Sequence, residues 1–332
     1  MPHSVILGTG RAVPAQVVSN DDLSRYMDTT DEWIRARTGI QERHWIVPGD
    51  RGVALGRDAS RQALGMAGLE PGSLDAIVYA TSTPDHFAPG NGVFLQRELG
   101  CGPTIPAIDI RMQCAGFIYA LSVADAYIRS GMFARVLVVG QEIQSTRMML
   151  STEGRHTAVI FADGAGAVVL GASEEPDRGI LAFDLHSEGA NAEKLWAEAP
   201  SAMVRLEDWP KDIAEGRCWL QMDGREVFRH AVVRMPESVR TVLGKAGWQA
   251  GEINLLIPHQ ANLRISESVQ KTMGLRDDQT YNNIQRYGNT TAATIPIALD
   301  ECVRGGRLTP GDRVIFTAFG SGFVWGSCAL RW

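Results

Sequence analysis

Short runs rich in Val, Ile and Leu alternate along this chain with longer amphipathic segments. In the first part of the chain, the spacing of apolar residues predicts helices at 57–66 and 116–130 and strands at 74–80, 106–110 and 135–140. In the second part, the same spacing predicts helices at 227–245 and 290–303 and strands at 253–257 and 313–318. Helices and strands that alternate in this way are typical of an α/β protein.

The two series resemble each other in sequence as well as in pattern. The segment LGMAGL at 64–69 recurs as LGKAGW at 243–248, and an apolar strand pattern follows each copy. Further on, the spacing of Asp, Arg and Gly at 125–131 recurs at 300–306. Matches that keep their order along the chain indicate an internal duplication.

We therefore expect two homologous halves, residues 1–172 and residues 173–332. The offset that aligns the two long helices places Cys114 opposite Asn289. Both residues should then lie just before equivalent helices. A helix N-terminus favours an anion, so a cysteine in this position should ionise more readily.

Composition and charge restrict the class of protein. The 332 residues are 45% hydrophobic and 21% charged, with a formal net charge of −6. This profile fits a globular protein and excludes disordered, collagen-like and small disulfide-stapled chains. Without a long Lys/Arg run, an acidic chain is not expected to bind nucleic acid. We expect a cytoplasmic protein without membrane insertion, because neither a secretory signal pattern nor about 18 consecutive apolar residues occur.

The cysteines do not form a recognisable framework. Five are present, widely spaced and without a Cys-x-x-Cys pair, namely Cys101, Cys114, Cys218, Cys302 and Cys328. An odd number at such spacings indicates neither a set of disulfides nor a zinc site. We expect no metal ion, although one of the thiols can still be reactive.

Cys114 lies between a predicted strand and a helix that is apolar nearly all round. A buried helix has a poorly screened N-terminal field, which is expected to lower the pKa of the thiol well below its free value of about 8.5. The alternative is an inert cysteine in the core, which is the usual fate of a buried thiol.

Other chemistry-bearing residues follow the strands of the second part. His259 comes directly after the predicted strand at 253–257, where α/β proteins collect catalytic groups. Asn289 precedes the helix at 290–303 and could equally be a simple N-cap. The glycines of FTAFGSGFVWG at 316–326 permit backbone N–H groups to approach a ligand closely, as in an oxyanion hole, or form a structural turn.

Together these segments resemble the β-ketoacyl-acyl-carrier-protein synthase III family. The resemblance extends over nearly the whole chain. It rests on TTDEWIRARTGIQERH at 29–44, the cysteine before its helix, GRHTAVIFADGAGAVV at 154–169, PHQAN at 258–262, YGNT at 287–290 and FGSGFVWG at 319–326. It implies a thiolase-type fold, a five-layered α-β-α-β-α sandwich of two duplicated halves.

The resemblance also implies an enzyme, an acyltransferase that performs a decarboxylative Claisen condensation. The Cys114 thiolate would take the acyl group from acyl-CoA, and malonyl-acyl-carrier-protein would supply the second unit. His259 and Asn289 would hydrogen-bond the malonyl thioester oxygen, and the amides of Cys114 and Ser321 would form the oxyanion hole for the acyl carbonyl. Because these two substrates supply all the reacting groups, no cofactor is expected. The reaction would initiate fatty-acid synthesis.

The family pattern assigns further residues to substrate binding. Trp33, Arg37 and Arg155 match positions near the adenine end of CoA. Asn262 matches a residue that lines the catalytic cavity. Phe87 matches a residue that reaches across a dimer interface into the partner's acyl pocket, so the resemblance implies a homodimer.

Docking of the acyl carrier protein is the last role that the resemblance assigns. Arg229, Arg264 and Lys271 match basic positions around the tunnel mouth. Such a local patch would attract an acidic carrier protein or the phosphates of CoA even though the whole chain is acidic.

Three departures from the family pattern leave the exact role open. The loop at 88–92 reads APGNG, the residues at 111–113 before the nucleophile are bulky, and Ser321 replaces a frequent glycine. The alternatives are a ketosynthase of specialised metabolism, of the quinolone, resorcinol or pyrone type, and a non-decarboxylating acyltransferase. A non-catalytic partner of the chain-length-factor kind usually lacks the nucleophile. The sequence does not determine the length of the acyl chain or whether CoA or a carrier protein delivers the first substrate. It also does not determine whether the second substrate carries a malonyl or a β-ketoacyl group.

Overall fold

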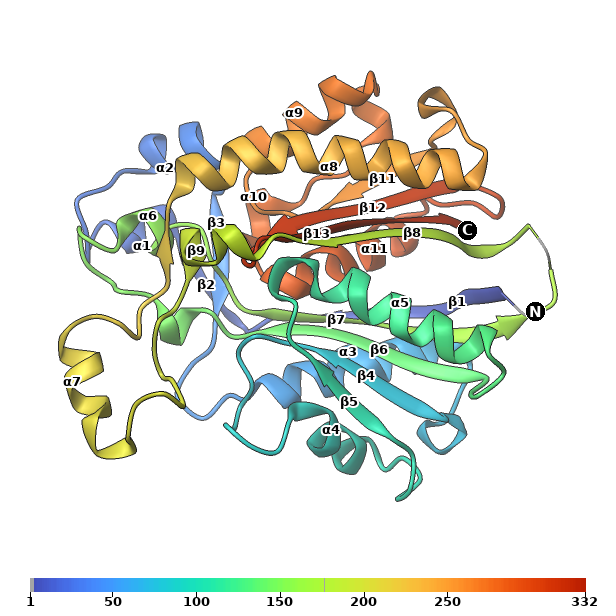
Figure 1. The fold of residues 1–332 in the computed structure, drawn as a ribbon, viewed down its shortest axis with the longest axis horizontal. Coiled ribbons are helices and arrows are strands. Elements are labelled where there is room, and N and C mark those ends of the chain that lie inside the picture. The colour runs from blue at the N-terminus through green and yellow to red at the C-terminus, as the bar shows by residue number, and fades with distance from the viewer. Residues whose placement is uncertain (1–2, 176) are drawn as a thin grey trace.

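The computed structural model describes residues 3–175 and 177–332, and two larger β-sheets form its framework (Figure 1). The first sheet has five strands in the order β1 (His3–Ala12), β7 (Gly164–Ser173), β6 (Arg135–Glu142), β4 (Ala76–Ala80) and β5 (Ala107–Ile110). The second sheet has four strands in the order β8 (Gly179–Ser187), β13 (Val324–Arg331), β12 (Arg313–Gly320) and β11 (Leu255–Pro258).

Helices cover both faces of each sheet, which gives five layers (Figure 1). The central layer consists of α5 (Gly116–Arg129) and α11 (Thr294–Arg304). The outer layers are α3 (Gly52–Ala67) with α4 (Asn91–Leu99) on the first sheet, and α8 (Gly224–Ala246) with α9 (Leu263–Met273) on the second. Each interface between layers has its own buried apolar cluster. This arrangement confirms the predicted α-β-α-β-α sandwich.

The two sheets repeat one topology. In the first sheet, β1 pairs antiparallel with β7, β7 pairs antiparallel with β6, and β6 pairs parallel with β4. In the second sheet, β8 pairs antiparallel with β13, β13 pairs antiparallel with β12, and β12 pairs parallel with β11. β5 corresponds to an isolated parallel bridge between Leu256 and Thr280. The repeated topology supports the division into residues 1–172 and 173–332, which stays a prediction.

Smaller elements lie on the side of the sandwich shown at the left of Figure 1. They comprise the helices α1 (Asn20–Leu23), α2 (Asp31–Thr38), α6 (Arg155–Ala158), α7 (Trp209–Ala214) and α10 (Ile284–Tyr287), and the strand pairs β2 (Gln16–Ser19) with β3 (Glu42–Trp45) and β9 (Leu195–Trp196) with β10 (Gln221–Met222). The chain between β9 and β10 is an excursion that carries α7. No helix in the described part of the chain has both the length and the apolar character needed to cross a membrane.

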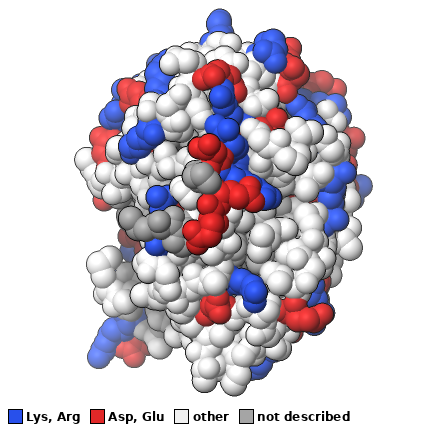
Figure 2. All heavy atoms as spheres, turned by 90° about the vertical axis from the view of Figure 1, so that its right-hand side faces the viewer, with Lys and Arg blue, Asp and Glu red and all other residues white. Residues whose placement is uncertain are grey.

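The opposite side, where β1 begins and β13 ends, faces the viewer in Figure 2. Its Lys and Arg side chains are interspersed with Asp and Glu. Positive charge therefore does not gather into one broad patch on this face, which agrees with the acidic net charge of the chain.

Candidate active site

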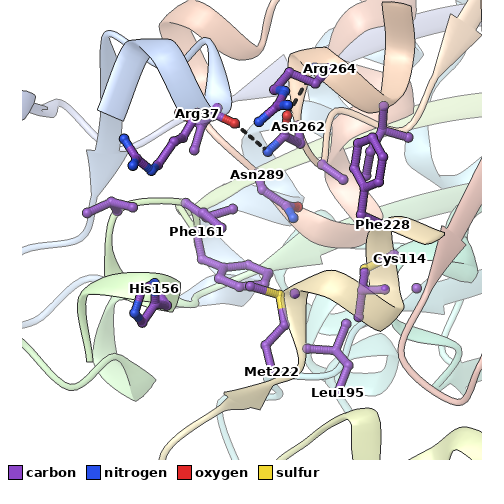
Figure 3. A pocket seen from close by; sticks show the side chains of 18 of the residues that line it. Arg37, Cys114, His156, Phe161, Leu195, Met222, Phe228, Asn262, Arg264 and Asn289 are labelled. Atoms are coloured by element: carbon purple, nitrogen blue, oxygen red, sulfur yellow. Dashed lines mark hydrogen bonds between the residues drawn. The ribbon is translucent and has the colours of Figure 1, made fainter. Parts of the chain in front are cut away.

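A cavity of about 490 Å³ lies between the two halves of the fold and brings the three predicted catalytic side chains together. Cys114, His259 and Asn289 all line it, although they come from segments far apart in the sequence. Figure 3 shows Arg37, Asn262 and Arg264 along one side of the cavity, and Cys114, Leu195 and Met222 on the other. The carboxyl ends of strands and the starts of the two central helices converge here, as expected for an α/β protein.

Cys114 lies in a 3₁₀ turn, Gln113–Ala115, that leads directly into α5. The side chain is buried, and burial raises the pKa of the Cys114 thiol to about 12. The nearby carboxylate of Glu142 raises this pKa as well, while the backbone N–H groups of Ser321 and Cys114 lower it. The prediction of a strongly lowered thiol pKa is therefore wrong, because burial and Glu142 outweigh the field at the helix end. The resting nucleophile is a protonated thiol.

The predicted equivalence of Cys114 and Asn289 is also wrong. The 3₁₀ turn before α5 matches a second 3₁₀ turn, Thr291–Ala293, before α11. The first residue of each turn has a positive φ, 42° at Gln113 and 50° at Thr291. The second residues are then Cys114 and Ala292, whereas Asn289 lies outside its turn. The three-residue error arose because α11 is shorter than α5, and the alignment used the ends of these helices.

The high thiol pKa makes alkylation of Cys114 strongly dependent on pH. A small neutral reagent such as iodoacetamide reacts with the thiolate, whose population rises about tenfold per pH unit below the pKa. We expect the rate of Cys114 alkylation to keep rising between pH 7 and 9.5, as followed by mass spectrometry of the Cys114 peptide. A rate that is already constant above pH 7 would contradict a protonated resting thiol.

His259 follows β11, and its ring is fixed by the second central helix. Nδ1 lies 2.7 Å from Oγ1 of Thr294, the first residue of α11. Nε2 is buried, has no hydrogen-bond partner in the described chain, and belongs to a residue that lines the cavity. Burial lowers the pKa of His259 to about 3, so the imidazole is neutral at physiological pH.

The Thr294 hydroxyl controls which tautomer this neutral ring adopts. Its Oγ1 lies 3.0 Å from the carbonyl of Thr291 as well as near His259, and a hydroxyl has a single proton to donate. When the proton points to Thr291, Nδ1–H donates to Oγ1 and Nε2 is an acceptor. When the proton points to Nδ1, Nε2 carries a hydrogen and is a donor. By rotating, the hydroxyl can thus pair with either tautomer, whereas the exchange between the tautomers requires one proton to reach Nε2 and one to leave Nδ1. Nε2 can accept a proton in one tautomer and donate a hydrogen bond in the other.

We expect Thr294→Ala to lower kcat for the complete reaction by about 10- to 100-fold with little change in KM, because the ring loses the hydroxyl that positions it. Steady-state kinetics measure this split between kcat and KM. Thr294→Ser retains the hydroxyl and should recover most of the rate. Equal loss in both variants would show that the methyl group, and hence packing, is what matters at this position.

Asn289 is oriented by its own backbone and by the segment that precedes β7. Its N–H donates to the carbonyl of Ile160 and its carbonyl accepts from Ala162, at 2.9 Å each. Its Oδ1 accepts a hydrogen bond from the N–H of Thr291 at 2.9 Å, as an N-cap would. The amide oxygen is therefore occupied, and Nδ2 is the group that Asn289 offers to a ligand in the cavity.

The loop after β12 closes over the nucleophile. Gly320 is the last residue of β12, and a Cβ built on it would lie 2.5 Å from Sγ of Cys114. Ser321 follows, and its hydroxyl donates to the carbonyl of Leu195, which leaves the Ser321 N–H directed at the thiol. The N–H groups of Ser321 and Cys114 thus approach the same sulfur, in the arrangement that an oxyanion hole requires.

The residues predicted to bind CoA meet at the entrance of the cavity. The Trp33 ring has two cations near its faces, with Cζ of Arg37 4.2 Å and Cζ of Arg155 5.1 Å from the ring centroid. Trp33 and Arg37 line the cavity, and Arg155 is anchored by a 2.7 Å hydrogen bond to the carbonyl of Asp28. The result is an aromatic and cationic platform, which suits a flat base attached to phosphates.

Asn262 both lines the cavity and joins two helices. Its Nδ2 donates to the carbonyl of Arg37 at 2.9 Å, and its Oδ1 accepts from the N–H of Arg264 at 3.0 Å (Figure 3). Asn262 is thus the N-cap of α9 and a link to the end of α2. The prediction placed it in the cavity but did not foresee this link.

The predicted docking residues are only partly brought together. Arg264 lines the cavity, while Lys271 is an exposed residue in the last turn of α9. Arg229 is exposed and forms a 2.6 Å ion pair with Glu226, which offsets its charge. Arg225, which the sequence did not single out, also lines the cavity. The basic groups nearest the entrance are therefore Arg225, Arg264 and Arg37.

Phe87 is separate from this site. Its side chain is 82% exposed, and the described residues that line the cavity do not include it.

Several lining residues were missed by the sequence analysis. Apolar side chains from distant segments complete the wall, including Phe161, Leu195, Met222 and Phe228. Phe161 also forms an isolated bridge with Asn289. Its only sequence signal is its place in the GRHTAVIFADG motif. Within residues 3–175 and 177–332, no group of three or more His, Cys, Asp or Glu residues is placed to hold a metal ion.

Comparison with known proteins identifies the family to which the chain belongs. Family models described as 3-oxoacyl-[acyl-carrier-protein] synthase III and its C-terminal part match residues 108–189 and 243–332. The β-ketoacyl-[acyl-carrier-protein] synthase III of Desulfotalea psychrophila is 43% identical, over 99% of both chains.

Solved structures give the same result. 3-Oxoacyl-[acyl-carrier-protein] synthase III from Aquifex aeolicus is 40% identical with a TM-score of 0.91, covering 99% of this chain and 100% of its own. The priming β-ketosynthase of the R1128 polyketide pathway is 34% identical with a TM-score of 0.91, covering 99% and 96%. The present chain therefore belongs to the 3-oxoacyl-[acyl-carrier-protein] synthase III family.

Proposed function

We propose that this protein condenses an acyl group from acyl-CoA with malonyl-acyl-carrier-protein, releasing CO₂, and so initiates fatty-acid synthesis. The observation that carries the proposal is the convergence of Cys114, His259 and Asn289 on one cavity. The relatives named above are synthases of this type by their names. The two substrates supply all the atoms of the product, so we propose that no further cofactor takes part.

In the first half-reaction, Sγ of Cys114 attacks the acyl thioester carbonyl. A bond forms between Sγ and the acyl carbon, and the bond from that carbon to the CoA sulfur breaks. The thiol proton passes to Nε2 of His259, which accepts it in one tautomer, and then to the departing CoA sulfur. The N–H groups of Cys114 and Ser321 stabilise the negative oxygen that forms on the acyl carbonyl.

In the second half-reaction, malonyl-acyl-carrier-protein loses CO₂ and its thioester oxygen becomes negative. Nε2–H of His259 and Nδ2–H of Asn289 donate to this oxygen. The resulting carbanion attacks the acyl carbon on Cys114, the bond from that carbon to Sγ breaks, and the β-ketoacyl product leaves on the carrier protein. The released Cys114 thiolate regains a proton from water, which its high pKa favours.

We propose that the entrance binds the non-acyl part of CoA, its adenine nucleotide and pantetheine arm. Trp33 would stack on the adenine between the Arg37 and Arg155 guanidinium groups, and Asn262 would keep α2 and α9 in place around the pantetheine arm. The acidic carrier protein would then dock on the basic rim formed by Arg264, Arg229 and Lys271, to which Arg225 adds a fourth charge.

We also propose a cytoplasmic homodimer. β5 is the edge strand of the first sheet, so its outer hydrogen-bonding groups are open to a second strand. Phe87 lies in the loop that leads into α4, a helix in contact with β5, and is largely exposed, as a residue that inserts into a partner subunit would be. A sedimentation measurement on the wild type and on Phe87→Ser would detect this association.

A specialised ketosynthase is the second candidate. It is favoured by the likeness to a priming ketosynthase of polyketide biosynthesis and by the bulky residues at 111–113. A non-decarboxylating acyltransferase is not favoured, because transfer of an acyl group alone has no use for the His259 and Asn289 donors.

The two half-reactions can be tested separately. In Asn289→Ala, we expect acylation of Cys114 to persist, because Asn289 acts in the second half-reaction. In His259→Ala, acylation should slow as well, because the Cys114 thiol loses its proton acceptor. In both variants condensation should fall by about 100-fold or more, because each loses an oxyanion donor. Intact-protein mass spectrometry measures the acyl adduct, and release of labelled CO₂ measures condensation. Normal CO₂ release in both variants, with product formed, would overturn the assignment of these residues.

A further inference from the structure

A second cavity, of about 410 Å³, opens on the other side of the nucleophile. Cys114, Phe161 and Leu195 line both cavities, so the thiol lies where the two meet. If the pantetheine arm of CoA fills the first cavity, as proposed above, the acyl group on Cys114 extends into the second cavity. The lining of the second cavity therefore decides which acyl groups the enzyme accepts.

Two arginine residues line this second cavity from separate segments. Arg111 follows the edge strand β5, and Arg147 ends the 3₁₀ turn that follows β6. The Arg111 side chain is exposed and that of Arg147 is half-buried. Burial lowers the pKa of Arg147, and the like charge of Arg111 lowers it further. Two positive groups thus face one space, at a cost in free energy that an anion would remove.

The carboxylates of the chain do not neutralise this pair. Within residues 3–175 and 177–332, no carboxylate oxygen lies within 4.0 Å of either guanidinium group. The buried acid Glu142 acts on Arg147 through its charge, but its oxygens accept hydrogen bonds from Ser82, Thr83 and Gln144.

The state of Glu142 weakens its effect further. Burial raises its pKa to about 7, so near neutral pH the group is only partly charged. Glu142 itself is not among the described residues that line the cavity; the acid among them is Glu198, on the excursion after β9, whose charge acts on Arg217. The cavity is therefore short of negative charge.

We infer, resting on the proposed function, that the second cavity accepts an acyl group with a terminal carboxylate, the half-thioester of a dicarboxylic acid. Arg111 and Arg147 would bind the far carboxylate while the near carbonyl is attacked by Cys114. A guanidinium group matches a carboxylate in shape and charge, and such bonds are about twice as strong as neutral ones. A plain alkyl chain would cover both cations and leave them unpaired.

The remaining lining agrees with a polar acyl group. Gln113, Thr291 and Ser321 contribute polar side chains close to the nucleophile. The inference also explains the bulky residues at 111–113, which depart from the family pattern. They place a cation and an amide where small residues would leave room for an apolar chain.

The test compares two acyl donors of equal carbon number, glutaryl-CoA and pentanoyl-CoA, by the initial rate of acylation of the Cys114 peptide in the full-length protein. We expect wild type to react at least about 10-fold faster with glutaryl-CoA, the effect of one charged hydrogen-bonding partner. Arg147→Gln and Arg111→Gln should each remove most of that preference and leave the pentanoyl rate unchanged or higher. Arg276→Gln is the control, since Arg276 is exposed and paired with Asp278 outside both cavities.

The outcomes separate this inference from the function on which it rests. Faster acylation by pentanoyl-CoA in the wild type, or a glutaryl preference that survives in both arginine variants, would overturn the inference and leave the proposed function intact. Failure of every acyl-CoA to modify Cys114 would overturn both. Because the pentanoyl rate reports folding, a misfolded variant is recognised by loss of both activities.

Discussion

Replacing Cys114 with alanine is expected to abolish the acyl-enzyme and to lower the rate of condensation at least about a thousandfold, because the described residues that line both cavities at once include no second nucleophile. Loss of one buried sulfur should cost only about 1 kcal/mol of stability. Decarboxylation of malonyl-acyl-carrier-protein should continue, since His259 and Asn289 remain. Mass spectrometry after incubation with acyl-CoA measures the adduct, and thermal unfolding measures stability.

Cys302→Ala is the matched control for this prediction. Cys302 is as buried as Cys114, but it lies in α11 and outside both cavities. This variant should keep the acyl adduct and the rate of the wild type. Acylation of the Cys114→Ala protein at another residue, for example Cys218 in the second cavity, would show that the nucleophile has been wrongly assigned.

Gly320→Ala has the next largest expected effect. The new methyl carbon would lie 2.5 Å from Sγ of Cys114, well inside van der Waals contact, and neither β12 nor the turn at Cys114 can move freely. We expect acylation to fall by about 100-fold or more through displacement of the sulfur. Overpacking should lower the free energy of unfolding by about 1–3 kcal/mol.

Gly65→Ala offers the matched control. Gly65 lies within α3, and no described atom beyond its chain neighbours and the backbone of its own helix lies within 4 Å of the added carbon. Alanine should stabilise the helix by about 0.5–1 kcal/mol and leave acylation unchanged. Kinetics and chemical denaturation on both variants separate the local clash from a general effect. Full activity in Gly320→Ala would mean that the sulfur lies elsewhere in the working enzyme.

Most elements of the fold could be predicted from apolar periodicity, and the differences have tertiary causes. α3 begins at Gly52 instead of residue 57, because the carboxylate of Asp85 accepts the N–H groups of Gly52 and Val53. The predicted helix at 290–303 is a 3₁₀ turn followed by α11, since Thr291 has a positive φ held by contacts with Asn289 and Gln144. Asp85 and Gln144 are distant in sequence from the segments that they hold, so they leave no local signal there.

The candidate site was predictable where its chemistry is carried by uncommon residue types in short motifs. Cys114, His259 and Asn289 each follow a strand or precede a helix, so topology alone could bring them together. Glu142 and Arg147 could not be found in this way. Their effects depend on burial and on neighbours such as Ser82 and Arg111, which only the folded chain places beside them.

The most direct test of the central claim follows the acyl group on Cys114 through one turnover. Enzyme loaded with acyl-CoA is freed of CoA and mixed with malonyl-acyl-carrier-protein, and the adduct, labelled CO₂ and carrier-bound product are measured together. The account predicts that one CO₂ and one β-ketoacyl carrier protein appear for each acyl group that leaves Cys114. Loss of the adduct without CO₂, or product formed while the adduct persists, would contradict it.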